Sequence, residues 1–144
     1  MNRGVAQRDN FKKRDIQTLI HENEISYTIR GAVFKVHTEL GPGLLESVYE
    51  SALAYELREE GLDVLTQLGI PVVYKEIEMN QGFRMDLLVN SKVIVEVKSV
   101  DTLLDVHHKQ LLTYLKLSNI KLGLLINFNV TTLKNSIIRI VNNL

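Results

Sequence analysis

Hydrophobic residues in the first third of the chain recur at the three- and four-residue spacing of amphipathic helices. This spacing predicts one helix over residues 22–39 and a second over 44–60. Gly41-Pro42-Gly43 breaks the pattern between them, and Gly61 ends the second helix. Helical spacing returns over residues 105–117. The sequence therefore predicts two helices near the N-terminus and a third well beyond them.

The middle of the chain alternates apolar and polar residues with the period of two that is typical of half-buried strands. Asn80-Gln81-Gly82 has the composition of a hairpin turn. Residues 121–128 are almost continuously apolar, which indicates a buried strand, whereas residues 131–144 suit a helix or a strand equally. The four short strands predicted upstream cover residues 63–68, 72–79, 82–89 and 92–99. This order of elements predicts an α/β fold, a mixed β-sheet flanked by α-helices.

Composition and charge set limits on the class of protein. Hydrophobic residues make up 45% and charged residues 24% of the 144 residues, which is typical of a globular protein. Lys+Arg and Asp+Glu both total 17, so the basic excess of a broad, non-specific nucleic-acid coat is missing. The chain has no cysteine, which excludes disulfides, thiolate metal sites and a cysteine nucleophile. A local acidic site with a few basic neighbours remains compatible with this balance.

The N-terminal residues differ from the rest of the chain. Residues 1–20 form a polar arm with its basic residues gathered at Arg8 and 12–14, and residues 21–144 form one domain. The arm has no apolar segment of the length that a signal peptide needs, and no stretch approaches 18 consecutive apolar residues. We therefore expect a cytoplasmic protein without a membrane-spanning helix.

The candidate chemistry lies on the hairpin of residues 83–98. If Asn90-Ser91-Lys92 is a three-residue loop, Val89 pairs with Val93 and Leu87 with Val95, which sets Asp86 opposite Glu96. One face would then be apolar (Phe83, Met85, Leu87, Val89, Val93, Val95 and Val97) and the other would carry Arg84, Asp86, Leu88, Ile94, Glu96 and Lys98. Directly opposed side chains have Cβ atoms about 5 Å apart, so the two carboxylates would repel unless a proton or a cation lay between them. A two-residue loop would send them to opposite faces.

Asp86, Glu96 and Lys98 together suit metal-dependent cleavage of phosphodiester bonds. Carboxylate oxygens are the ligands of Mg²⁺, which takes only one or two from the protein. A lysine two residues beyond the second acid shares its face, where it could orient a water or neutralise charge on a phosphate. The alternative is a solvent-facing sheet in which Arg84 and Lys98 balance the acids. The spacing by itself leaves both open.

Asp86 followed by Glu96-Val97-Lys98 resembles the signature of the PD-(D/E)XK nuclease superfamily, with Met85 in place of the proline. Gly43-Leu44-Leu45-Glu46-Ser47-Val48-Tyr49 resembles the naming motif of its GxxExxY branch. The wider resemblance covers about residues 25–141 and includes His37, residues 40–43, 55–57, 110–115 and 124–128. It implies a restriction-endonuclease-like core and a nuclease that uses Mg²⁺ or Mn²⁺.

The resemblance also assigns residues outside the hairpin. It implies that Glu46 lies near the metal as a ligand or as support for one, although an acid in a first helical turn also suits the helix dipole. Tyr49 could hydrogen-bond a carboxylate or a phosphate, or be a half-buried core residue. Gln110-x-x-x-Tyr114 resembles the QxxxY motif of exonuclease-like branches, which implies that Gln110 supports Lys98 while Tyr114 positions substrate. A polar rim on an amphipathic helix is the alternative.

These expectations combine into a metal-dependent nuclease. Asp86 and Glu96 would be its metal ligands, with Glu46 beside them, and Lys98 and Gln110 would assist catalysis. Tyr49, Tyr114 and Arg84 are the candidates for substrate contact. The partner would be nucleic acid, with DNA favoured, and a homodimer would supply the two sites that cutting both strands requires. A catalytically silent binding module on the same fold, or a plain structural domain, are the competing hypotheses.

Overall fold

The computed structural model describes residues 20–144, except for the side chains of Asn80 and Gln81. The predicted polar arm lies outside the described residues, apart from Ile20. The three predicted helices and the buried strand are present within two residues of their expected bounds, and the tail forms a strand. In chain order the elements are α2 (Glu22–Leu40), α3 (Glu46–Glu59), β1 (Val64–Tyr74), β2 (Ile77–Val89), β3 (Val93–Lys98), α4 (Asp105–Ser118), β4 (Leu122–Asn127), the 3₁₀ turn η1 (Leu133–Asn135) and β5 (Ile137–Val141).

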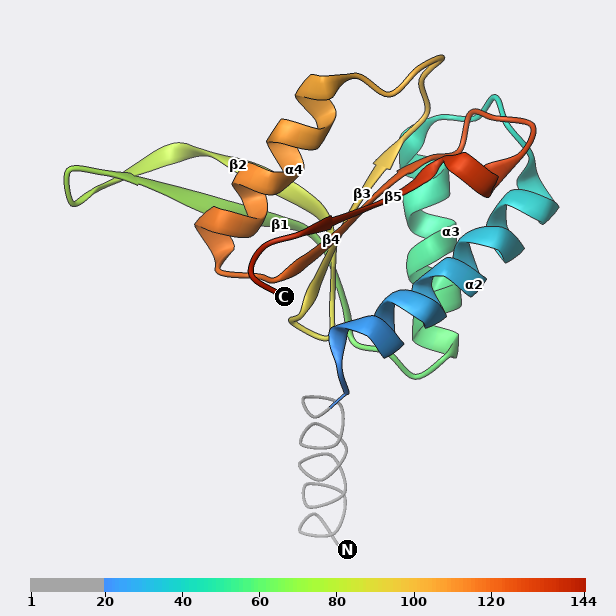
Figure 1. Cartoon of the computed structure of the whole chain (residues 1–144), viewed down its shortest axis with the longest axis horizontal. Helices are drawn as coiled ribbons and strands as arrows, with labels where there is room; N and C mark the ends of the chain where they lie inside the picture. The colour runs from blue at the N-terminus through green and yellow to red at the C-terminus, as the bar shows by residue number, and fades with distance from the viewer. Residues whose placement is uncertain (1–19) are drawn as a thin grey trace, which may run out of the picture.

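The five strands form one mixed sheet in the order β1-β2-β3-β4-β5. β3 and β4 are parallel and are joined by the crossover helix α4, whereas the other neighbouring strands are antiparallel. α4 covers one face of the sheet, and α2 and α3 cover the other (Figure 1). The predicted α/β class, a mixed sheet flanked by helices, is confirmed.

The sheet has a hydrophobic core on each face. Leu87, Val89 and Val95 pack with residues of α2 and α3, whereas Leu88 and Ile94 pack with α4. Every residue of β4 is buried, as the continuous apolar run predicted. Because both faces are covered, a polar side chain on a central strand is buried unless a gap opens beside it.

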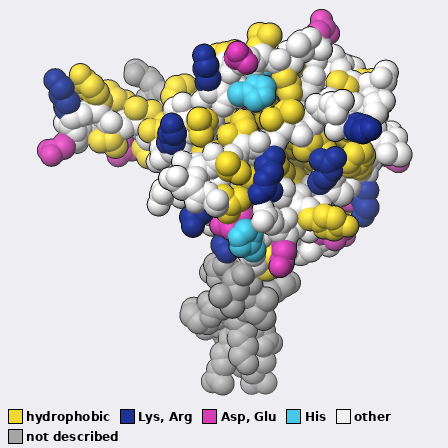
Figure 2. All heavy atoms as spheres, viewed as in Figure 1, with side chains coloured by type: hydrophobic (Ala, Val, Ile, Leu, Met, Phe, Trp, Pro, Cys, Tyr) yellow, Lys and Arg dark blue, Asp and Glu magenta, His cyan; other side chains and the backbone are white. Residues whose placement is uncertain are grey.

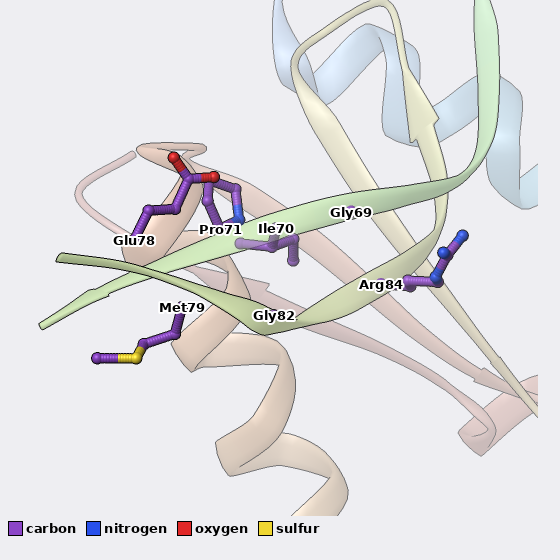
Figure 3. A pocket seen from close by; sticks show the side chains of 7 residues that line it. All are labelled: Gly69, Ile70, Pro71, Glu78, Met79, Gly82 and Arg84. Atoms are coloured by element: carbon purple, nitrogen blue, oxygen red, sulfur yellow. The ribbon is translucent and has the colours of Figure 1, made fainter.

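β1 and β2 form a long hairpin that extends past α4 and away from the core (Figure 1). Its turn is Lys75-Glu76, with φ of 49° and 66°, so the turn predicted at Asn80-Gln81-Gly82 is wrong. Gly82 lies within β2 and allows a close approach of the two strands, because a Cβ there would lie 2.0 Å from the carbonyl oxygen of Ile70 on β1. Figure 3 shows Ile70 and Gly82 on the two strands, with Arg84 on the core side of Gly82.

The end of the hairpin exposes apolar side chains. Val73, Tyr74 and Ile77 are each about 60% exposed beside Lys75. In Figure 2 the β1–β2 hairpin shows hydrophobic surface, with a basic and an acidic side chain at its end. Lys and Arg side chains are scattered over the rest of this face. In the part of the chain that the structure describes, no helix has the length and apolar character needed to cross a membrane.

Candidate active site

Asp86 is the residue at which β2 loses its regular pairing with both neighbouring strands. The β2–β3 ladder pairs Val89 with Val93 and Leu87 with Val95, as predicted, and stops there. The β1–β2 ladder pairs residues on either side of Gln67 and Asp86 but skips these two. Gln67 has a positive φ of 53°, which is uncommon for a residue with a side chain and interrupts the strand geometry. A polar opening is therefore built into the middle of the sheet.

The carboxylates of Asp86 and Glu96 take the place of the missing ladder. The amide N–H of Val97 donates to Oδ2 of Asp86 at 2.8 Å, and the amide N–H of Asp86 donates to Oε1 of Glu96 at 3.1 Å. Each acid thus accepts a hydrogen bond from the strand that carries the other. Glu96 is only 5% exposed, although it is a carboxylic acid. The predicted opposition of the two acids is confirmed by these reciprocal bonds.

Burial and repulsion change the protonation of this pair. Burial, followed by the negative charge of Asp86, raises the pKa of Glu96 from its usual 4.5 to about 8, against the opposing influence of the Lys98 ammonium. Glu96 therefore holds its proton at neutral pH while no cation is bound. A cation placed between the two acids would relieve the same repulsion, which is the electrostatic property of a metal-binding carboxylate pair.

The predicted division of the β2–β3 hairpin into two faces is wrong for Phe83 and Met85, which precede Asp86 on β2. Phe83 and Met85 were expected on the face of Leu87, but Met85 belongs to the core beneath α4. Phe83 packs against Tyr114 of α4, with ring centroids 5.2 Å apart. Met85 and Leu87 thus face opposite helix layers, so the simple alternation breaks at Asp86.

Asp86 opens into a hollow of about 530 Å³ on the α3 side, whose lining includes Glu46, Glu50, Gln67, Asp86 and Ser99. The Nε2 of Gln67 donates to both carboxylate oxygens of Glu50, at 3.0 and 2.9 Å, and to Oδ1 of Asp86 at 3.3 Å. Burial raises the pKa of Glu50, and so do the charges of Asp86 and Glu46, while the Gln67 hydrogen bonds lower it. The sequence analysis missed both Glu50 and Gln67.

Glu46 reaches the α3-side hollow from the first turn of its helix. Its Oε1 accepts a hydrogen bond from the amide of Ser99 at 3.3 Å, and the hydroxyl of Ser99 donates to the carbonyl of Leu44 at 2.7 Å. These two bonds attach the start of α3 to the end of β3, directly after Lys98. The carboxylate of Glu46 therefore lies beside the same hollow as Asp86.

Tyr49 has a structural position, which is the second of the two alternatives for this residue. It is fully buried and stacks on Phe128 with centroids 4.5 Å apart. Its hydroxyl donates to the carbonyl of Gly41 and accepts a bond from the amide of Leu44 at 3.2 Å. Tyr49 thus holds the Gly-Pro-Gly loop in place, and its burial rules out direct contact with substrate.

Lys98 opens into a second hollow of about 430 Å³ on the α4 side, whose lining includes Phe83, Lys98, His107, Lys109, Gln110 and Tyr114. Gln110 and Tyr114 lie one helical turn apart and both line it, so the QxxxY residues and Lys98 are brought together. Burial, followed by the charges of Glu96 and Asp86, raises the pKa of Tyr114 to about 12. Asp86 and Lys98 were expected on one face, but they open into hollows on opposite sides of the sheet.

Two further residues complete the surroundings. Arg84 is exposed, and its guanidinium donates to the carbonyl of Gln67 at 3.4 Å, next to the opening at Asp86. Asn127, on β4 beside Lys98, is buried, and its amide side chain bonds both the N–H and the carbonyl of Val100. Asn127 therefore fixes the loop that follows Lys98. The sequence analysis gave it no role, although a polar residue at the end of an apolar strand was a visible signal.

The donor atoms here suit a hard divalent cation. Among residues 20–144, no three His, Cys, Asp or Glu side chains are gathered closely enough to hold a metal as they stand. Asp86 and Glu96 nonetheless supply carboxyl oxygens at one place, where burial and the negative charge of Asp86 raise the pKa of Glu96. The residues fit Mg²⁺ or Mn²⁺ with two protein carboxylates and the remaining positions left to water or substrate.

A family model described as the PD-(D/E)XK nuclease superfamily matches residues 23–140. The match includes every candidate site residue and all five strands except the last residue of β5. No curated protein and no solved structure matches the chain.

Proposed function

The chain belongs to the PD-(D/E)XK nuclease superfamily, and on this premise we propose that it is a divalent-metal-dependent nuclease that hydrolyses phosphodiester bonds of nucleic acid. The observation that carries the proposal is the reciprocal bonding of Asp86 and Glu96 at the break in the β2–β3 ladder. Two acids held this way offer carboxyl oxygens to a cation, whose charge would displace the proton of Glu96, inside a sheet whose other central residues are largely apolar.

Asp86 and Glu96 would hold the metal, and Glu46 would reach it from the α3-side hollow. A cation held by these residues would supply the polarisation of a phosphoryl oxygen and would lower the pKa of a water. Gln67 orients the Asp86 carboxylate through its hydrogen bond and leaves Oδ2 to the Val97 amide. Glu50 shares that glutamine and keeps it in place.

The residues of the α4-side hollow act on the substrate. The Lys98 ammonium lies two residues beyond Glu96 and neutralises charge that develops on the phosphate in the transition state. Gln110 supplies an amide that can hold a water or a phosphate oxygen beside Lys98. Tyr114, like any tyrosine, keeps its hydroxyl proton at neutral pH, and its pKa is raised further to about 12, so it can donate a hydrogen bond to an anionic oxygen.

We propose that the chain belongs to the GxxExxY branch, and the position of each residue of the motif supports this proposal. Gly43 has a φ of 98°, which favours glycine, Glu46 bonds the Ser99 amide, and Tyr49 holds the loop between them. The three residues thus connect the α2–α3 loop to the end of β3. This connection links the motif to the strand that carries Glu96 and Lys98.

The proposal is tested by incubating the purified protein with labelled single-stranded, duplex and branched DNA and with RNA. Mg²⁺, Mn²⁺ and EDTA are compared in parallel for wild type, Lys98→Ala and Lys121→Ala. Lys121 is exposed at the start of β4, at the opposite end of the parallel pair from Lys98, and serves as the matched control. We expect metal-dependent cleavage that is lost in Lys98→Ala and retained in Lys121→Ala. Cleavage in EDTA, or none by folded wild type on any substrate, would contradict the proposal.

A further inference from the structure

The α4-side hollow is lined in part by Phe83, an aromatic residue to which the proposed chemistry gives no role. Phe83, three residues before Asp86 on β2, is 43% exposed at this hollow. Tyr114 packs against the Phe83 ring at an angle of 39° and is itself only 4% exposed. Tyr114 therefore supports the Phe83 ring from the protein side, while part of the ring remains open to the hollow.

The charges around the ring favour a polyanion over an apolar peptide. Lys98 and Lys109 line the same hollow as Phe83. Neither Glu96 nor Asp86 is among the residues that line this hollow, although the charges of both act on Tyr114. A strand whose phosphate is held beside Lys98 would carry its neighbouring nucleoside into the space over Phe83. Aromatic rings next to basic groups are the usual way in which proteins bind unpaired bases.

We propose that Phe83 is the stacking platform for an unpaired base next to the scissile phosphate, so that the substrate is single-stranded or locally unpaired nucleic acid. This inference rests on the proposed nuclease function for the position of the phosphate. Within a duplex, each base is stacked between its neighbours and has no free face for a protein ring. The hollow therefore selects strands in which at least one base is free to leave the stack.

Phe83→Leu removes the aromatic face while keeping an apolar side chain, and Phe83→Tyr keeps the face. Phe34→Leu is the matched control, because Phe34 is also a half-buried phenylalanine (40% exposed) but lies on α2, away from both hollows. Each variant is made in an Asp86→Asn background and studied in EDTA, so that binding is measured without cleavage. The probe is a single-stranded oligonucleotide carrying one 2-aminopurine, whose fluorescence falls when the base stacks on an aromatic ring.

We expect Phe83→Leu to weaken binding of this oligonucleotide by about five-fold or more and to abolish the quenching, whereas Phe83→Tyr and Phe34→Leu change neither. Binding of a blunt, fully paired duplex should be unaffected by Phe83→Leu. Equal effects of Phe83→Leu and Phe34→Leu, or quenching that persists without the ring, would overturn the inference. Metal-dependent cleavage by wild type is scored separately. If wild type cleaves nucleic acid but Phe83 does not stack on the base, only the inference about Phe83 fails. If the base stacks but wild type does not cleave, only the nuclease proposal fails.

Discussion

Replacing Glu96 by glutamine should stabilise the metal-free protein, and increasingly so as the pH rises. In the folded state the pKa of Glu96 is about 8, against 4.5 for an ordinary glutamate. Between these values the folded protein binds more protons than the unfolded chain, so this group makes stability fall as the pH rises. The loss is about 1.4 kcal/mol per pH unit, or about 3 kcal/mol between pH 5 and pH 8 once the flattening near the pKa is included.

Glutamine has the shape of glutamic acid and can still accept the bond from the amide of Asp86, but it carries no charge at any of these pH values. We expect urea unfolding in EDTA at pH 5, 6, 7 and 8 to show a stability difference between Glu96→Gln and wild type that widens by about 3 kcal/mol. Glu59→Gln, at the exposed end of α3, is the control. Subtracting wild type from each variant cancels the titration of the histidines. A difference that stays constant from pH 5 to pH 8 would refute the buried-pair reasoning.

Two further variants test the framework around the site. Gly82→Ala would place a Cβ against a backbone carbonyl of β1, so we expect urea unfolding to show a free energy of unfolding that is lower by about 1–3 kcal/mol. Gly69→Ala, the control, has open space at its Cβ and should lower it by less than about 1 kcal/mol. Equal losses in the two variants would contradict this expectation. Tyr49→Phe keeps the stacked ring but removes both hydroxyl hydrogen bonds, so we expect a loss of about 1–3 kcal/mol against almost none for the exposed Tyr27→Phe. Unchanged stability in Tyr49→Phe would show that the loop does not depend on this residue.

The register of the β2–β3 hairpin could be predicted because it depends on local features. Valines alternate on both strands, and a three-residue loop at residues 90–92 brings the valines of the two strands to one face, which is the register that the structure has. Asp86 and Glu96 were therefore found from the sequence, together with their opposition. The helices could also be predicted from the sequence, since the spacing of their apolar residues matches the helical period.

The features that the sequence did not reveal all depend on unusual backbone geometry or on distant contacts. Lys75 and Glu76 form a turn with positive φ although neither is glycine or asparagine, whereas Asn80-Gln81-Gly82 has turn composition but lies in a strand. Gln67 on β1 has a positive φ beside Asp86, where the side-chain alternation of β2 also breaks. No local pattern signals either departure. Glu50 and Gln67 join the site only through tertiary contacts that bring α3 and β1 together.

The most direct test of the account is the single-turnover cleavage rate of Asp86→Asn relative to wild type, measured in Mn²⁺ on the best substrate found. Asp63→Asn is the matched control, because Asp63 is an exposed acid near the opposite end of the β2–β3 hairpin. The account predicts that Asp86→Asn folds normally, binds Mn²⁺ much more weakly and loses cleavage by at least about a hundredfold, whereas Asp63→Asn matches wild type. Cleavage by Asp86→Asn at the wild-type rate would contradict it.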